Sequence, residues 1–395
     1  MKKGMKMLLA VCALAFTVLL LSGTESKAAT STTMNLRQTD AGTSYIYLEW
    51  NANLLADRYE VYLSTDAKNW VKKDYSYSAK GSVFGLGAGS AYYAQVRAYT
   101  ESGAWFLTSE TAVVATKPAE VKGLAQTGAT ANSISMSWTP VSGANGYIIY
   151  ASVNYNWVKI ATTTRNSATI SGLPASSEVK YCVAATRNVT GGTVIGTQSS
   201  GVYMRTVPAK VSRIAMTYYW DSLREAKYEW TQMNNVDGYQ YEVKKSNGKK
   251  TYFSGTTTSS YAYAKPFPKG TFIKARVRAY ITIGNRRVYG PWSSYTYSAA
   301  NKKVTAKRSS NGKKIYLKWK KISGVSGYQV YVSTKSNSGF KKVKSLSSKK
   351  TKYTITKCGK KKLKKGKTYY VRLKYQTKVG KKKVTGSIIS EATVY

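Results

Sequence analysis

Apolar and polar residues alternate in four short segments of the chain. These segments begin at Tyr92, Val179, Ile273 and Tyr369, and they read YYAQVRAY, VKYCVAA, IKARVRAY and YYVRLKY. In the last segment the apolar face carries Tyr369, Val371, Leu373 and Tyr375. Alternation with one apolar face predicts a half-buried strand of an antiparallel sheet.

The same alternation leads into a tryptophan four times. The anchors are Trp50, Trp138, Trp230 and Trp319, which are 88, 92 and 89 residues apart. Nine residues after each anchor a tyrosine opens a second strand-like run, at Tyr59, Tyr147, Tyr239 and Tyr328. A fixed period of about ninety residues indicates a tandem repeat, in which each copy is one small all-β unit.

The joints between copies divide the chain into four predicted domains. The segments TKPAEV and TVPAKV match each other and place Pro118 and Pro208 ninety residues apart, as short extended X-Pro connections. The predicted domains cover residues 30–117, 118–207, 208–300 and 301–395.

Residues 1–29 read as a secretory signal peptide. Lys2, Lys3 and Lys6 precede an apolar run at residues 7–21, and small residues then suit cleavage after Ala28 or Ala29. The alternative, an uncleaved anchor, is disfavoured because the run is shorter than the ~20 residues that span a bilayer. No second long apolar run follows, so we expect no membrane span in the mature chain.

The repeat resembles the fibronectin type III family. The family's B-strand tryptophan corresponds to the four anchors, and its C-strand aromatic corresponds to the tyrosines nine residues later. Its passage into strand F is similar to LGAGSAYYAQVRA and LKKGKTYYVRLKY, whereas Val179 and Ile273 replace the family's corner tyrosine in the second and third copies. The resemblance covers the mature chain and implies an all-β fold of tandem immunoglobulin-like sandwiches. The lysine-rich form resembles repeats of secreted and cell-wall-associated proteins of Gram-positive bacteria, which serve as spacers, adhesion units or accessory modules.

Positive charge is concentrated in the last predicted domain. The chain has 62 basic and 17 acidic residues, a formal charge of +45, and residues 301–395 contain 29 of the basic residues against one acid, Glu391. Because lysines there surround a strand of clean alternation, they coat a folded domain and do not form a disordered tail.

The lysine coat supplies the principal candidate site, which consists of Lys360, Lys361, Lys362, Lys364, Lys365, Lys367, Lys381, Lys382 and Lys383. Repeated charge of this kind attracts polyanions. The predicted partner is an anionic cell-wall polymer or another extracellular polyanion, with other surface proteins as further partners. Secretion makes nucleic acid the less fitting polyanion. The alternative interpretation is a solvated surface that only keeps the protein soluble.

Exposed aromatic rings supply a second candidate, a carbohydrate-binding surface at Trp70, Trp157, Tyr331 and Tyr370. Trp70, Trp157, Tyr252 and Phe340 recur about twenty residues after the anchors, on a predicted strand next to strand C. The alternative is cross-strand packing of large side chains on a two-sided sheet, and we favour this structural interpretation.

Catalytic chemistry finds little support. The chain contains no histidine, which excludes Ser-His-Asp and Cys-His sites and histidine-based zinc sites. Glu49 and Glu229 point outward by alternation, and the sparse acids make a hydrolytic carboxylate pair a poor prediction. We expect Cys182 and Cys358 to be unpaired, Cys182 as a surface thiol and Cys358 as a thiol whose pKa neighbouring lysines lower. We therefore predict no enzyme and no cofactor or metal.

The sequence as a whole predicts a secreted or cell-wall-associated adhesion or scaffold protein that is held at the envelope by its basic last domain. The alternative is a carbohydrate-binding accessory module that acts through surface aromatics.

Overall fold

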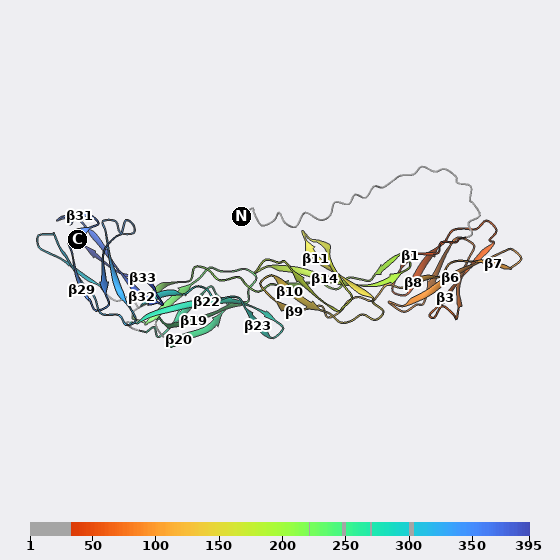
Figure 1. The fold of residues 1–395 in the computed structure, drawn as a ribbon, viewed down its shortest axis with the longest axis horizontal. Helices are drawn as coiled ribbons and strands as arrows, with labels where there is room; N and C mark the ends of the chain where they lie inside the picture. Colours follow the sequence, from red (N-terminus) through yellow and green to blue (C-terminus); the bar gives the residue numbers. More distant parts are fainter. Residues whose placement is uncertain (1–32, 221, 247–249, 269–270, 300–303) are drawn as a thin grey trace, which may run out of the picture. The chain divides into compact units, whose positions relative to one another are not determined.

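A computed structural model describes residues 33–220, 222–246, 250–268, 271–299 and 304–395. The predicted signal peptide lies outside these residues. By internal contacts the chain divides into two compact units, Met1–Lys117 with Asn188–Val194, and Pro118–Arg187 with Ile195–Tyr395. Figure 1 labels some of the strands of each unit.

The first unit contains one β-sandwich, here called the first sandwich (β1–β8). One sheet has the order β1-β2-β5 and consists of β1 (Arg37–Ala41), β2 (Tyr45–Glu49) and β5 (Lys80–Phe84). The other has the order β4-β3-β6-β7 and consists of β3 (Arg58–Ser64), β4 (Val71–Ser76), β6 (Ala91–Tyr99) and β7 (Trp105–Thr108), with β8 (Ala112–Ala115) also paired to β6. Ile46 and Leu48 from one sheet and Val61 and Val96 from the other are buried in one cluster, so the alternation of each strand closes a common core.

The same pair of sheets recurs three more times in residues 118–395. In the second sandwich the sheets are β13-β10-β9 and β12-β11-β14-β15, formed by β9 (Ala125–Ala129), β10 (Ser133–Ser137), β11 (Gly146–Val153), β12 (Asn156–Thr163), β13 (Ser167–Ser171), β14 (Glu178–Val189) and β15 (Gly192–Ile195), with β16 (Val202–Arg205) paired to β14. In the third they are β17-β18-β21 and β20-β19-β22-β23, formed by β17 (Ala215–Trp220), β18 (Glu225–Glu229), β19 (Gly238–Lys245), β20 (Thr251–Thr257), β21 (Tyr261–Ala264), β22 (Phe272–Ile283) and β23 (Arg286–Tyr289), with β24 (Thr296–Ala299) paired to β22.

The fourth sandwich has the sheets β25-β26-β29 and β28-β27-β32-β33. They are formed by β25 (Thr305–Arg308), β26 (Ile315–Lys318), β27 (Gly327–Ser333), β28 (Lys341–Ser347), β29 (Lys352–Ile355), β32 (Tyr369–Val379) and β33 (Lys382–Val394). A two-stranded hairpin, β30 (Lys357–Cys358) with β31 (Lys361–Lys362), follows β29. All the pairings in these sheets are antiparallel, as the alternation predicts.

Each core is built around the tryptophan and tyrosine that the sequence singled out. The four ring pairs, Trp50–Tyr59, Trp138–Tyr147, Trp230–Tyr239 and Trp319–Tyr328, meet edge to face with centroids 5.2–5.4 Å apart and planes 62–64° apart. In every copy the tyrosine hydroxyl accepts a hydrogen bond from a backbone N–H six residues earlier, as Ile322 N donates to Tyr328 over 3.2 Å. This bond gives the buried phenol a polar partner, so the pair fixes the second and third strands of each sandwich in one geometry.

The third and fourth sandwiches share apolar packing within the second unit. Phe272 and Tyr297, from β22 and β24, belong to the same buried cluster as Trp319 and Leu373. The N–H of Phe272 donates to the carbonyl of Ser323 over 2.8 Å. Removal of residues 301–395 would therefore expose Phe272, which is fully buried, and truncation is a poor test of what the last domain does.

Cys182 is not the surface thiol that its strand position predicted. It is completely buried, as is Ala184 two residues later on the same face of β14. These are short side chains, and their partners across the β11–β14 pairing are the larger Tyr150 and Ile148. Alternation assigned the face of the strand correctly, but it gave no information on how far neighbouring side chains cover it.

Candidate anion-binding surface

The first predicted lysine cluster lies on the β30–β31 hairpin and the loop after it. Its six members are all exposed: Lys360, Lys361, Lys362, Lys364, Lys365 and Lys367. Gly359 and Gly366 have φ values of 62° and 74°, a left-handed conformation that glycine adopts without steric cost. Leu363, only 4% exposed, anchors the middle of the segment in the core. The lysines face water because the apolar residue between them holds the loop against the sandwich.

Backbone carbonyls of this loop are held by Arg308 on β25. Its guanidinium donates to the carbonyl oxygens of Lys364 and Lys367, the second over 2.7 Å. The hydroxyl of Tyr369 accepts a hydrogen bond from the N–H of Lys364 over 3.0 Å. This is the tyrosine-corner bond that the resemblance implied for the last copy. The loop thus has a defined backbone, and its positive charge is presented at fixed positions.

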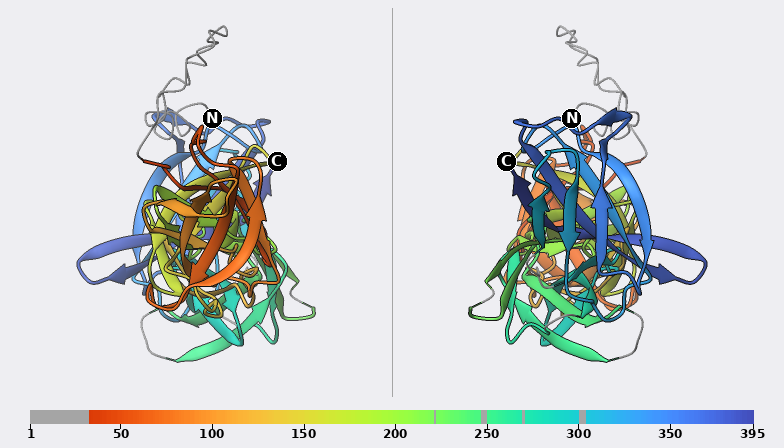
Figure 2. Two further views of the ribbon diagram at one scale, coloured as in Figure 1. Left: turned by 90° about the vertical axis from the view of Figure 1, so that its right-hand side faces the viewer. Right: turned by 90° about the vertical axis from the view of Figure 1, so that its left-hand side faces the viewer.

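The second cluster, Lys381–Lys383, lies at the tip of the β32–β33 hairpin. Gly380 occupies the turn with a φ of 56°, and all three lysines are exposed. Figure 2 shows this hairpin extending to the side of the fourth sandwich. The eleven residues of β32 separate the tip from the first cluster, a distance of roughly 30 Å. The structure therefore does not bring the nine predicted lysines into one site; they form two surfaces at opposite ends of one strand.

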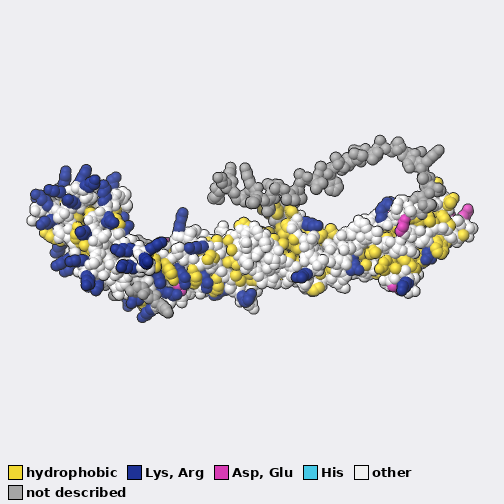
Figure 3. All heavy atoms as spheres, viewed as in Figure 1, with side chains coloured by type: hydrophobic (Ala, Val, Ile, Leu, Met, Phe, Trp, Pro, Cys, Tyr) yellow, Lys and Arg dark blue, Asp and Glu magenta, His cyan; other side chains and the backbone are white. Residues whose placement is uncertain are grey.

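Acidic neighbours are scarce around both surfaces. Glu391, the single acid of residues 301–395, forms an ion pair with Arg372 on β32. Figure 3 shows the crowding of Lys and Arg side chains over the fourth sandwich in the face drawn. The cluster lysines are therefore left with counterions from solution, and a bound polyanion would replace them.

Lysines also face each other across paired strands, which the sequence analysis missed. The opposed pairs are Lys318 with Lys352, Lys357 with Lys362, and Lys378 with Lys383. Like charges directly opposite each other destabilise a sheet. The signal that could have identified the first pair is the position before the anchor tryptophan, which is Glu49 in the first copy and Lys318 in the last.

The first sandwich provides an internal comparison at this position. Glu49 accepts from Arg37 over 3.0 Å and lies 3.1 Å from the ammonium nitrogen of Lys80. The hydrogen bond from Lys80 leads the effects that hold the pKa of Glu49 below its ordinary value. The same sheet position is thus neutralised in the first sandwich and repulsive in the fourth.

Neither cysteine has the environment of a nucleophile. Burial raises the pKa of Cys182 to about 11, and the nearby Lys180 offsets this only in part. Burial also raises the pKa of Cys358, against the opposing effect of Lys341 and Lys367. The expected lowering of the pKa of Cys358 is therefore wrong, because half-burial of the sulfur outweighs its lysine neighbours. Both thiols are unpaired, as expected.

The four predicted carbohydrate-contacting rings do not form one site. Trp70 lies in the first sandwich, Trp157 in the second, and Tyr331 and Tyr370 in the fourth. Trp157 is 38% exposed, whereas Trp70, Tyr331 and Tyr370 are half-buried. The ammonium of Lys374 lies 4.9 Å from the centroid of Tyr331, so one face of this ring is occupied by a cation.

Cation–aromatic packing recurs on the outer faces of these sheets. In the fourth sandwich the guanidinium of Arg372 lies 3.8 Å from the ring of Phe340. In the third, Arg276 and Arg278 lie 4.3 and 4.5 Å from the ring of Trp292. These contacts support the structural interpretation of the rings concerned, which pack against neighbouring cations on the same face.

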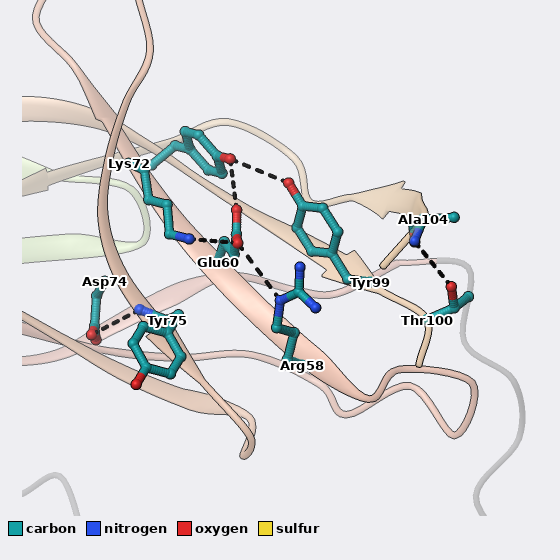
Figure 4. Close-up of polar contacts among 9 residues, drawn as sticks. Arg58, Glu60, Lys72, Asp74, Tyr75, Tyr99, Thr100 and Ala104 are labelled. Carbon is teal, nitrogen blue, oxygen red and sulfur yellow. Dashed lines mark hydrogen bonds and ion pairs between the residues drawn. The ribbon is translucent and has the colours of Figure 1, made fainter. Parts of the chain in front are cut away.

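In the first sandwich an acid completes this packing (Figure 4). Glu60 is 6% exposed and accepts hydrogen bonds from Lys72 Nζ over 2.6 Å and from the hydroxyl of Tyr62 over 2.8 Å. Burial alone would raise the pKa of Glu60, but the bonds from Lys72 and Tyr62 outweigh it and lower the pKa. Its carboxylate also lies 3.7 Å from Arg58 Nε, so it holds three side chains in place and has a structural role.

Within the described ranges, no group of three His, Cys, Asp or Glu residues is placed to hold a metal ion. None of the described residues forms a helix with the length and apolarity that crossing a bilayer requires.

Comparison with known proteins gives short matches. No family model matches the chain. Exochitinase 1 of Streptomyces olivaceoviridis is 45% identical over 56 residues, which are 14% of this chain and 9% of that protein. Chitinase A1 of Niallia circulans is 30% identical over 167 residues, which are 38% of this chain and 22% of that protein. The matched regions thus span less than a quarter of the length of either chitinase.

Two solved arrays of fibronectin type III domains also align with the chain. The chicken CNTN1 FN1–FN3 domains align over 70% of this chain and 99% of their own length, at 16% identity and a TM-score of 0.26. The central fibronectin-III array of RIM-binding protein aligns over 66% of this chain and 95% of its own, at 16% identity and a TM-score of 0.20.

The fold itself is defined by the chain's own strand order. Counted without the β30–β31 hairpin, each sandwich pairs a sheet of its first, second and fifth strands with a sheet whose order is fourth, third, sixth and seventh, which are A-B-E and C′-C-F-G in the usual letters. A tryptophan directly after strand B packs against a tyrosine on strand C in every copy. The chain is therefore a tandem array of all-β sandwiches with the fibronectin type III fold.

Proposed function

We propose that this protein is a secreted, non-catalytic scaffold or adhesion protein, held at the cell envelope by its fourth domain through an anionic polymer. The observation that carries this proposal is the unbalanced charge of that domain. Its two predicted lysine surfaces are fully exposed, and the only acid in residues 301–395 is already paired with Arg372.

Counterion release supplies the driving force. A polyanion carries condensed cations, and each lysine that neutralises one of its charges releases them, which makes affinity fall steeply with salt. The field of a domain with 29 basic residues also raises the rate of encounter with an anionic surface. The remaining sandwiches, with their apolar cores and structural ion pairs, act as the spacer that carries this anchor.

A salt series with purified cell wall tests the proposal. We expect the full-length chain to be retained at low ionic strength and released progressively as salt approaches molar concentration. A full-length variant with the nine cluster lysines changed to Gln should lose most of this retention. Charge variants are preferable to truncation because removal of the fourth domain would uncover Phe272. Retention that survives molar salt and is competed by neutral sugars would contradict the electrostatic anchor.

A second candidate function is binding of a neutral carbohydrate, and one surface of the second sandwich favours it. Trp157 and Tyr203 are 38% and 64% exposed. Lys180 lies beside both, 5.4 Å from the centroid of Tyr203, and with Trp157 it flanks Gly201. Exposed rings stack on sugar faces, and the two curated proteins with matching segments are chitinases. Trp157→Ala should abolish retention on insoluble chitin if this function holds, and it should leave retention on anionic wall unchanged.

A further inference from the structure

The open side of the fourth sandwich carries a groove between its two sheets. Strands β28 and β29 are the edge strands of different sheets, and they follow each other in the chain. A hollow of about 670 Å³ lies beside β28 and the β30–β31 hairpin, and another of about 820 Å³ lies beside β29 and β26. Tyr353 on β29 lines both, so the two hollows adjoin along this strand. We call them together the β28–β29 groove.

Nine exposed lysines and no acid line the β28–β29 groove. The first hollow has Lys341, Lys342, Lys357, Lys360 and Lys361, and the second has Lys307, Lys318, Lys350 and Lys352. The floor is apolar, formed in part by Ile355 in the first hollow and by Leu317 and Leu346 in the second. A cleft of one charge sign with low-dielectric walls concentrates the field, so an anion is attracted more strongly here than at the exposed hairpin tip.

Local geometry brings these charges together despite their repulsion. Lys318 lies opposite Lys352, a cross-strand pair of like charges. A Cβ on Gly359 would lie 2.7 Å from Cδ of Lys341, so glycine at this left-handed turn lets the stem of Lys341 pack against the β30–β31 hairpin. Lysines from both edge strands and from the hairpin are thereby directed to one groove.

In the first sandwich a hydrogen bond joins the two edge strands on the same side. Asp74 lies opposite Val61 there, and its carboxylate accepts a hydrogen bond from the N–H of Ser82 over 2.8 Å, which joins the edge strands β4 and β5. The corresponding residue in the fourth sandwich, opposite Val330, is Lys344, which is exposed and cannot accept. Two acids of the first sandwich, Glu49 and Asp74, thus correspond to lysines in the fourth.

We propose that the β28–β29 groove binds a linear phosphodiester polymer that lies along β29, with its phosphates between lysines of both edge strands. This inference rests on the proposed polyanion binding and specifies where it occurs and for which ligand. All nine groove cations are lysines, which act as point charges and hold a phosphodiester from any side. The two arginines of this sandwich are not available to the groove, since Arg308 donates to loop carbonyls and Arg372 pairs with Glu391. Tyr316 and Tyr353 offer apolar contact to the carbon units between phosphates.

Two full-length variants of equal charge test the location. The groove variant carries Lys318→Gln, Lys352→Gln and Lys357→Gln, and the tip variant carries Lys381→Gln, Lys382→Gln and Lys383→Gln. We expect the groove variant to bind poly(glycerol phosphate) about 10–100-fold more weakly at 0.15 M salt and to lower the salt slope by about 2–3. The tip variant should lose about threefold or less. Equal losses would overturn the groove while leaving the proposed function intact, whereas failure of the unmodified protein to bind any polyanion would overturn both.

Ligand class and location have independent readouts. Polyglutamate of equal charge should bind at least tenfold more weakly than poly(glycerol phosphate), and equal affinity would overturn the phosphodiester assignment. Acetylation footprinting of the unmodified protein should show Lys318, Lys352 and Lys357 protected by the phosphodiester polymer, with Lys381–Lys383 still reactive. The reverse pattern would overturn the groove without reliance on any variant.

Discussion

Lys318 on β26 lies directly opposite Lys352 on β29 in the fourth sandwich, where the first sandwich has Glu49 opposite Lys80. The two pairs have the same place in the sheet, but one joins opposite charges and the other joins like charges. One is a neutralised site whose acid contacts two cations, and the other is a repulsive site that an anion would relieve. This relationship separates stability from binding. A single acid at position 318 should stabilise the fourth sandwich and should weaken its binding of an anion.

We predict that Lys318→Glu stabilises the fourth sandwich by about 0.5–1 kcal/mol at low salt, since it converts a like-charge pair into an ion pair. Hydrogen exchange read by mass spectrometry should show slower exchange in peptides that cover β26 and β29. The gain should shrink at high salt, where exposed pairs are screened. Lys335→Glu, on an exposed loop of the same domain, is the control for net charge, and an equal effect there would contradict the pairwise explanation.

Much of the fold follows from alternation and from the ninety-residue period. The ring pair Trp319–Tyr328 could be predicted because both residues recur at fixed spacing, and the core strand from Tyr369 could be predicted because every second side chain is apolar. The hydrogen bond to the hydroxyl of Tyr328 could not, because its donor is a backbone N–H in a loop with no sequence signature.

The candidate site was less accessible to sequence reasoning. A run of lysines such as Lys360–Lys362 is visible in the sequence, but opposed lysines such as Lys318 and Lys352 lie 34 positions apart and meet only through strand pairing. The β28–β29 groove depends on these strands being edges of different sheets, which alternation does not encode. The prediction that Cys182 is a surface thiol failed for a related reason, since its burial depends on the size of Tyr150 on the paired strand.

Removal of the buried hydroxyl of Tyr328 should destabilise the fourth sandwich. Tyr328→Phe leaves the N–H of Ile322 without its acceptor in a buried position, which we expect to destabilise the fourth sandwich by about 1–3 kcal/mol. Hydrogen exchange in peptides of β26 and β27 is the measurement. Tyr316→Phe, on a ring that is 49% exposed, is the matched control and should change exchange by little. A similar effect in both variants would show that the hydroxyl of Tyr328 is not a special partner.

The two thiols should differ sharply in reactivity. With a pKa raised to about 11, Cys182 has roughly one thiolate per thousand molecules at pH 8, and it is also fully buried. Cys358 is half-buried and donates to the carbonyl of Val332 over 3.6 Å. Mass spectrometry after iodoacetamide treatment should find Cys358 modified well before Cys182, which should react only when urea unfolds the second sandwich. Equal rates in the native protein would contradict the burial of Cys182.

Acid should weaken the first sandwich through Glu60. Hydrogen bonds from Lys72 and Tyr62 lower its pKa despite burial, so the folded state binds the proton less tightly than the unfolded chain, whose pKa is about 4.3. The stabilisation is therefore present above the unfolded pKa and is lost as the pH falls through the lower, folded value.

We predict that Glu60→Gln destabilises the first sandwich by about 1–3 kcal/mol at pH 7, because Lys72 loses its charged partner while the amide oxygen can still accept from Tyr62. The difference from the unmodified protein should close as the pH falls through the lowered, folded-state pKa of Glu60, where protonation removes the same charge from Glu60 itself. Hydrogen exchange in β3 and β4, compared between the two proteins at each pH, cancels the intrinsic pH dependence of exchange. Glu101→Gln, at an exposed acid of the same sandwich, should show no such convergence, and a constant gap for Glu60→Gln at every pH would mean that packing and not charge stabilises this position.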